Sequence, residues 1–191
     1  MIRDRVSADD FLEWVLSQEG RFELVDGYVI EMMAGANQSH NAVVSNIVFS
    51  LRSQTKSVGC RTTSSNTAVQ TLANTIRYPD IVVDCGPPDL DAMVAESPTL
   101  VVEVSSPRLN SVDITNRLDE YREHPGIRLL MFVEPSRVVV KLYRRDSQGA
   151  WGSEKYDNLE SVIEMPEIGA SLALSEINDT LTPHKGKGCL R

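Results

Sequence analysis

The sequence predicts an α/β fold in which a mixed β-sheet is flanked by helices. Two observations lead to this prediction. Short β-prone runs occur before and after two segments with helical apolar spacing, so strands surround helices along the chain. The 191 residues are also 41% apolar and 24% charged, a composition typical of one globular domain with its own core. We expect this domain over residues 1–181 and a flexible tail over residues 182–191, which have little apolar surface to bury.

The N-terminal region predicts a short helix followed by a β-hairpin. Ser7, with an acidic residue three positions later, resembles a capping box, and apolar residues then recur at helical spacing until Gly20. Two β-prone runs follow, Arg21 to Val25 and Tyr28 to Met33. They are joined by Asp26-Gly27, a dipeptide that accepts the positive φ angles of a two-residue turn. We assign Asp26 to this turn alone.

The middle of the chain predicts a long helix and two apolar strands. From Gln38 to Lys56, the apolar residues form one stripe at helical spacing. The runs Ile76 to Cys85 and Thr99 to Ser105 are apolar, but each is interrupted by an acidic residue.

A second helix and two more strands complete the predicted sheet. The segment Asn110 to His124 places Ile114, Leu118 and Tyr121 on one helical face, and Pro125-Gly126 ends the helix. Two further β-prone runs follow and are expected to pair, namely Ile127 to Val133 and Arg137 to Tyr143.

The cysteines and the apolar runs bear on the cellular compartment. The longest apolar run, Leu129 to Val133, is far shorter than the roughly 20 residues of a membrane helix, so we expect a cytoplasmic protein without a membrane partner. The cysteines are odd in number and contain no CxxC pair, which argues against a disulfide framework. We therefore expect Cys60, Cys85 and Cys189 to be reduced.

Two carboxylates interrupt apolar strands at positions where burial is costly without a partner. Asp80 follows Pro79 at the start of one strand, and Glu103 follows three aliphatic residues in the other. If the two strands are neighbours, these oxygens form a site for a hard cation such as Mg²⁺. The alternative is that Asp80 caps a turn and Glu103 faces solvent.

The order of these features resembles the PD-(D/E)XK restriction-endonuclease-like nucleases, and within them the Uma-type family. The similarity extends in order over nearly the whole domain. The residues that carry it are Phe22-Glu23-Leu24-Val25-Asp26-Gly27, His40, Tyr78-Pro79-Asp80-Ile81, Val102-Glu103-Val104-Ser105-Ser106-Pro107, Asp113, Arg117, Tyr121, and Gly126-Ile127 through Val133-Glu134-Pro135. The resemblance implies a restriction-endonuclease-like core, a divalent metal and a DNA substrate.

The sequence departs from the PD-(D/E)XK pattern at its lysine. Ser105 stands where that signature has lysine, and the Uma-type variant instead places a lysine on the next helix, where this chain has Arg117. Arginine can still neutralise charge on a phosphate, although its planar fork places that charge differently. The alternative is a surface ion pair between Arg117 and Asp113 four residues earlier.

Two more residues become candidates through the resemblance. His40 points toward the sheet and is either a core or capping residue or an accessory group that contacts phosphate or water. Glu23 is either a solvent-facing carboxylate or a third acidic group of the site. Asp84 and Asp113 are candidates only for supporting the metal ligands.

The charge distribution limits how such a protein meets nucleic acid. The chain carries 19 basic and 27 acidic side chains, a net charge of −8. Residues 32–79 contain no Asp or Glu but hold Arg52, Lys56, Arg61 and Arg77, which leaves −12 on the rest. Because affinity for nucleic acid comes largely from cations that meet phosphates, we expect weak, salt-sensitive contact at one face.

The resemblance thus predicts a metal-dependent DNA endonuclease that hydrolyses phosphodiester bonds with Mg²⁺, or with Mn²⁺ as a substitute. Asp80, Glu103 and the Val104 carbonyl are the expected metal ligands. Arg117 is expected to stabilise developing charge, and Glu23 and His40 to order the metal shell or the attacking water. The alternatives are a degenerate member that binds nucleic acid or a protein without cleavage, and a purely structural domain. A homodimer is compatible with either activity.

Overall fold

The computed structural model describes the chain except for residues 1–4, 33–34, 88, 90, 106–110 and 182–191. Its largest element is a six-stranded sheet with the order β10-β9-β8-β7-β6-β3. Neighbouring strands are antiparallel except for β7 and β8, which are parallel, so the sheet is mixed as predicted. The strands are β3 Arg61–Ser64, β6 Ile81–Asp84, β7 Pro98–Val104, β8 Leu129–Glu134, β9 Val139–Arg145 and β10 Trp151–Tyr156.

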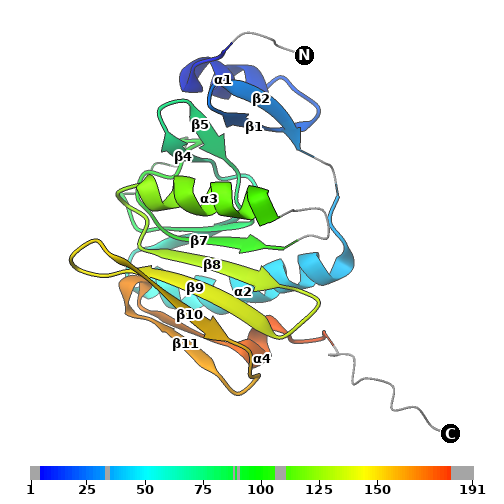
Figure 1. The fold of residues 1–191 in the computed structure, drawn as a ribbon, viewed down its shortest axis with the longest axis vertical. Coiled ribbons are helices and arrows are strands. Elements are labelled where there is room, and N and C mark those ends of the chain that lie inside the picture. The colour runs from blue at the N-terminus through cyan, green and yellow to red at the C-terminus, as the bar shows by residue number, and fades with distance from the viewer. Residues whose placement is uncertain (1–4, 33–34, 88, 90, 106–110, 182–191) are drawn as a thin grey trace, which may run out of the picture.

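Two helices cover the opposite faces of this sheet (Figure 1). Helix α2, Gln38–Ser57, joins the core that contains Val102 and Val104 of β7, and α3, Ser111–Glu123, joins the core that contains Val101. All seven residues of β7 are buried because side chains on both of its faces are covered. The expected flanking of a mixed sheet by these two helices is therefore confirmed, with Tyr121 completely buried on α3.

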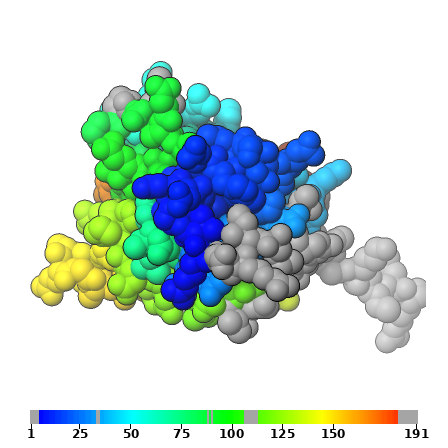
Figure 2. Space-filling view, turned by 90° about the horizontal axis from the view of Figure 1, so that it is seen from above, coloured from blue at the N-terminus to red at the C-terminus, as the bar shows by residue number. Residues whose placement is uncertain are grey.

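A smaller sheet, with the order β2-β1-β5-β4, lies at the N-terminal end (Figure 1). Its strands are β1 Arg21–Val25, β2 Tyr28–Met32, β4 Val69–Leu72 and β5 Thr75–Arg77. Helix α1, Ala8–Val15, packs Phe11 against Leu24 and Ile76 on one face of this sheet. Seen from this end of the molecule, the blue N-terminal residues occupy the middle of the surface (Figure 2). The turn at Asp26 and Gly27 has φ angles of 49° and 80°, which confirms the predicted hairpin.

The C-terminal region forms elements that the sequence did not predict. Strands β11 Val162–Met165 and β12 Ala170–Ala173 make a hairpin around a short 3-10 helix, η1 Pro166–Ile168, and helix α4 Leu174–Ile177 follows. Gln54 of α2 exchanges two hydrogen bonds with the Ser171 backbone of β12, at 2.9 and 3.0 Å. This hairpin therefore closes the core on the α2 side.

The predicted strand from Ile76 to Cys85 is in fact two strands in two different sheets. Strand β5 ends at Arg77 in the small sheet, and β6 begins at Ile81 in the large one. Pro79 explains the interruption, because proline has no N–H to donate to a ladder and restricts the residue before it. Asp80 consequently lies at the junction between the two sheets.

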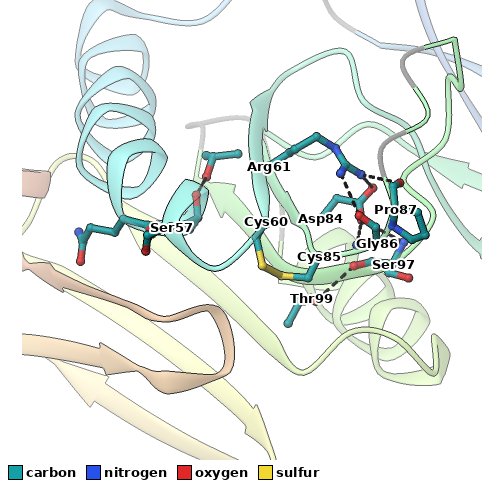
Figure 3. The surroundings of a disulfide bond; sticks show 12 residues. Ser57, Cys60, Arg61, Asp84, Cys85, Gly86, Pro87, Ser97 and Thr99 are labelled. Carbon is teal, nitrogen blue, oxygen red and sulfur yellow. Dashed lines mark hydrogen bonds and ion pairs between the residues drawn. A yellow bond between two sulfur atoms is a disulfide. The ribbon is translucent and has the colours of Figure 1, made fainter.

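The expectation that Cys60 and Cys85 are reduced is wrong, because they form a disulfide with a Cα–Cα distance of 4.1 Å (Figure 3). Arg61 pairs with Asp84 in the β3–β6 ladder, so the residues just outside this pair are brought together by the register. Sequence spacing gives no sign of such a pairing. Cys189 lies outside the described residues.

None of the helices in the described part of the chain is long and apolar enough to cross a membrane.

Candidate active site

The five side chains predicted to act together meet where the two sheets and α3 adjoin. Asp80 precedes β6 and Glu103 lies on β7, while Arg117 comes from α3, Glu23 from β1 and His40 from the first turn of α2. Five segments of the chain thus supply the ion pairs and hydrogen bonds around the central strands.

Asp80 and Glu103 lie opposite each other at the end of the β6–β7 ladder. The register pairs Ile81 with Val102, and its continuation by one residue brings Asp80 to Glu103. The Val104 N–H donates to Asp80 Oδ2 at 2.8 Å, so this carboxylate reaches across to β7 and does not cap its own turn. Glu103 is 7% exposed, which contradicts the solvent-facing alternative.

Burial dominates the electrostatics of Glu103. Desolvation raises its pKa to about 7, and the charges of Asp80 and Glu23 act in the same direction. The charge of Arg117 and a hydrogen bond from the Tyr121 hydroxyl, at 2.7 Å, lower the pKa and limit this shift. The two donors therefore do not fully offset the burial of the Glu103 carboxylate, and its pKa stays above the usual value.

Arg117 lies between two carboxylates inside the protein. Its Nη1 donates to Glu23 Oε1 at 3.1 Å and to Glu103 Oε1 at 3.2 Å, and its Nη2 donates to Glu23 Oε2 at 2.7 Å. Burial acts to lower the pKa of Arg117, but the charges of Glu103 and Glu23 raise it above its usual value. The alternative of an exposed ion pair on the surface of α3 is therefore wrong for Arg117, whose side chain is 13% exposed.

Glu23 is 2% exposed, so the solvent-facing alternative is also wrong for this residue. The period of β1 does turn Glu23 away from Phe22 and Leu24, but that face of the small sheet lies against α3 and not against water. Its oxygens accept hydrogen bonds from Arg117, from Arg77 and from the Tyr78 N–H.

Arg77 and Glu120 belong to the same network, and the sequence prediction missed both. Arg77 donates through Nε and Nη2 to the two oxygens of Glu120, at 2.7 and 2.6 Å, and through Nη1 to Glu23 at 2.9 Å. A signal was present, because Arg77 interrupts a β-run in the way that Asp80 and Glu103 do. The sequence prediction took only the acidic residues that interrupt a β-run as candidates for the site.

His40 approaches the site from the far side of the sheet. Its Nε2 lies 3.3 Å from Asp80 Oδ1, and this hydrogen bond raises the pKa of the imidazole above its usual value. Asn37 caps α2 by accepting the His40 N–H, which fixes the backbone at this position. The Nδ1 atom is buried without a hydrogen-bond partner among the described residues. His40 is therefore in place to orient Asp80.

Asp84 and Asp113, the two candidates for supporting the metal ligands, and Asp26 of the hairpin turn have other surroundings. Asp84, at the opposite end of β6, accepts backbone N–H groups from Gly86, Glu96 and Ser97 and pairs with Arg61 at 3.1 Å (Figure 3). It therefore orders a loop away from Asp80. Asp26 lies in the hairpin turn, as expected. Asp113 has an exposed side chain on α3.

Residues 32–79, which contain no Asp or Glu, contribute less free positive charge than their composition indicates. Arg77 is neutralised by Glu23 and Glu120, and Arg61 by Asp84. Arg52 and Lys56 remain exposed, one turn apart near the C-terminal end of α2 and far along that helix from His40.

The carboxylates of the site are donors of the kind that a hydrated divalent cation takes. The network holds the four carboxylates Glu23, Asp80, Glu103 and Glu120 and the two guanidiniums Arg77 and Arg117, a net charge of −2 when Glu103 is ionised and His40 is neutral. Among the described residues no group of three or more His, Cys, Asp or Glu side chains is arranged to hold a metal. A donor set of two carboxylates and a backbone carbonyl suits Mg²⁺, which is usually bound through one or two carboxylates and water.

Comparisons with known proteins agree with the fold and with the sequence pattern. A crystal structure of a "putative nuclease belonging to DUF820" from Anabaena variabilis superposes with a TM-score of 0.72 at 19% identity, over 90% of this chain and 97% of that one. An uncharacterized protein of Synechocystis sp., slr1290, is 26% identical over 176 residues, which is 91% of each chain. The Uma2 family, described as "Putative restriction endonuclease", matches residues 8–175. Because that match spans most of the sequence, the protein belongs to the Uma2 family.

Proposed function

We propose that this protein is a metal-dependent endonuclease that hydrolyses phosphodiester bonds in DNA. The observation that carries the proposal is that Asp80, directly before β6, accepts the N–H of Val104 on the adjacent strand at 2.8 Å, next to Glu103. The guanidinium of Arg117 lies 3.2 Å from Glu103. Two acidic oxygens and a fixed cation in one buried site are the groups that a phosphodiester needs for charge neutralisation.

Each residue of the site has a separate task in this reaction. Asp80, Glu103 and the Val104 carbonyl are the groups that would hold Mg²⁺ or Mn²⁺. When bound, such an ion polarises the phosphate and lowers the pKa of a bound water. Arg117 stabilises negative charge that develops on the phosphate, and its position is fixed before the substrate arrives. His40 holds Asp80 through Nε2 and so keeps that carboxylate turned toward β7.

A second function, DNA binding without cleavage, is favoured by one specific observation. Oε1 of Glu103 already accepts hydrogen bonds from Arg117 and from Tyr121. A divalent ion must therefore share this carboxylate with the Arg117 guanidinium. The planar guanidinium is held by several hydrogen bonds at once, so it makes room for an ion less readily than the flexible ammonium of a lysine would. In this case the site would bind phosphate with little or no hydrolysis.

Plasmid cleavage distinguishes the two functions. Supercoiled DNA is incubated with Mg²⁺ or Mn²⁺ and with wild type, Asp80→Asn or Arg117→Lys. An endonuclease predicts nicking by the wild type that EDTA abolishes and that Asp80→Asn reduces by at least about 100-fold. If the wild type binds DNA but cuts none, and Arg117→Lys does cut, the chain is a binding protein whose arginine suppresses catalysis.

The matched control is Asp84→Asn, at the other end of the same strand. Asp84 is 7% exposed and pairs with Arg61, while the Asp80 side chain is 19% exposed and pairs with His40. Each substitution therefore removes the charge from one partner of a largely buried pair and carries a risk to folding. We expect Asp84→Asn to lower stability while metal-dependent nicking by the folded fraction continues. Equal loss of nicking in both variants would contradict the assignment of Asp80.

A further inference from the structure

We propose that Arg77 and Glu120 are positioning residues that act on the site through Glu23. Their effect is to hold the guanidinium of Arg117 at Glu103. This inference rests on the proposed function, since it concerns how the guanidinium of that site is oriented. In it, Glu23 fixes the position of Arg117 and does not bind the metal.

Both oxygens of the Glu23 carboxylate accept two hydrogen bonds each. Oε1 accepts from Arg117 Nη1 at 3.1 Å and from the Tyr78 N–H at 3.1 Å, and Oε2 accepts from Arg117 Nη2 at 2.7 Å and from Arg77 Nη1 at 2.9 Å. An ionised carboxylate offers about four lone-pair sites. These four bonds fill them, which leaves Glu23 no oxygen lone pair with which to bind a metal or orient a water.

These ion pairs form a ring that the backbone of α3 closes between Arg117 and Glu120. Arg117 on α3 bonds Glu23, Glu23 bonds Arg77, and Arg77 bonds Glu120, which lies three residues after Arg117 on the same helix. Residues three apart are neighbours on a helical surface. Helix α3 therefore holds Glu23 in two ways. Arg117 bonds it directly, and Glu120 holds it through Arg77, whose guanidinium bonds both oxygens of Glu120.

The ring formed by Arg117, Glu23, Arg77 and Glu120 carries no net charge. Its two guanidiniums and two carboxylates sum to zero, so the negative charge of the site is left on Asp80 and Glu103, the two carboxylates outside the ring. Buried ion pairs contribute little net stability compared with apolar residues of similar volume. A neutral, rigid ring of this kind is better explained by its geometry, because it fixes the plane of the Arg117 guanidinium.

Kinetic coupling between Glu120 and Arg117 tests the proposal. Glu120→Gln keeps the side-chain shape and removes the charge that holds Arg77. In the wild-type background we expect kcat for DNA nicking to fall about 10-fold, with KM changed much less. Arg77→Lys, which cannot form the fork, should give a similar loss. In an Arg117→Ala background, itself slower by about 100-fold, Glu120→Gln should cause no further loss.

The matched control is Glu154→Gln. Glu154 of β10 shares Arg144 of β9 with Glu167 of η1, in a glutamate–arginine pair that is more exposed than the Arg77–Glu120 pair. We expect kcat to be unchanged in this variant. If Glu120→Gln slows the Arg117→Ala enzyme as much as it slows the wild type, its effect does not pass through Arg117 and the proposal is wrong.

A second measurement needs no cleavage and separates this proposal from the proposed function. The Nη protons of Arg117 should give separate, slowly exchanging NMR signals in the wild type, and Glu120→Gln or Arg77→Lys should abolish the separation. If no variant cuts DNA but these signals behave as stated, the ring stands and the nuclease assignment fails. Signals of Arg117 that are unchanged by both substitutions would overturn the ring.

Discussion

At the scale of single residues, Tyr121 shows how a buried hydroxyl controls the charge of a carboxylate. The ring is completely buried, and desolvation together with the charge of Glu103 raises the Tyr121 pKa well above its usual value. The hydroxyl therefore stays protonated and donates to Glu103 Oε1 at 2.7 Å. This bond lowers the pKa of Glu103, whereas burial raises it.

We predict that Tyr121→Phe destabilises the metal-free protein by about 2 kcal/mol at pH 8, because it removes a hydrogen bond to a charged group and leaves that group buried. Urea unfolding followed by tryptophan fluorescence measures the change. Tyr143→Phe is the control, because the Tyr143 ring packs edge-on against Phe132 in the same core. We expect the control to change the free energy of unfolding by less than about 0.5 kcal/mol. Equal losses in the two variants would argue against the Glu103 bond.

At the scale of elements, α3 is the helix on which the site depends, because it carries Arg117, Glu120 and Tyr121. The chain leaves this helix through His124, whose N–H bonds the Tyr121 carbonyl and whose Nδ1 accepts the Gly126 N–H at 3.1 Å. Burial lowers the pKa of His124 below its usual value, and the charge of Arg145 lowers it further. The neutral imidazole is thus the form that the folded state prefers.

This preference predicts how stability depends on pH. Below about 6.5 the unfolded chain takes up a proton that folded His124 resists, so this residue makes the free energy of unfolding fall as pH decreases toward the folded pKa. His124→Gln cannot titrate, and we expect the loss of stability between pH 7 and pH 5 to be smaller in this variant than in the wild type. Urea unfolding at several pH values measures the difference. A steeper loss in the variant would mean that the pKa of His124 is raised.

At the scale of the whole molecule, the disulfide ties β3 to β6 across a sequence separation of 25 residues. A loop of this length loses chain entropy on closure that corresponds to about 3 kcal/mol of stability. We predict that the double substitution Cys60→Ser with Cys85→Ser lowers the free energy of unfolding by about this amount. Cys189→Ser is the control and should have no effect. A thiol titration of the denatured, unreduced chain should find one thiol of the three cysteines, and three thiols would contradict the disulfide.

The elements best predicted from the sequence are those specified by local signals. The Asp26-Gly27 hairpin and helix α2 follow from turn chemistry and from apolar spacing, which act within a few residues. Pro79 marks the break between β5 and β6 locally. The membership of these two strands in different sheets and the disulfide, however, depend on which strands become neighbours, and no local pattern specifies this. The hairpin of β11 and β12 was missed because its strands have only four residues each and pack on α2 from far along the chain.

Some residues of the site can be predicted from the sequence, whereas their partners cannot, because local signals specify the former and tertiary packing the latter. Asp80 and Glu103 are visible as acidic residues inside apolar runs, and the structure pairs the residues next to them, Ile81 and Val102, in adjacent strands. The partners of Arg117 are not visible, because they lie 94 and 14 residues away and are defined only by the packing of α3 between two sheets. The sequence therefore predicts which groups are present, and the tertiary structure decides which of them are paired.

The overall charge makes the metal central to the proposed function. The chain has a net charge of −8, and its site sums to −2 when Glu103 is ionised and His40 is neutral, so it would repel the polyanionic substrate of the proposed function without a bound cation. The most direct measurement is the rate of supercoiled plasmid nicking as a function of Mg²⁺ concentration, for the wild type and for Glu103→Gln at equal folded fractions. We predict nicking that rises with Mg²⁺, saturates and stops with EDTA for the wild type, and a rate at least about 100-fold lower for Glu103→Gln. Nicking that persists in EDTA, or that is equal in the two proteins, would contradict a metal site at Asp80 and Glu103.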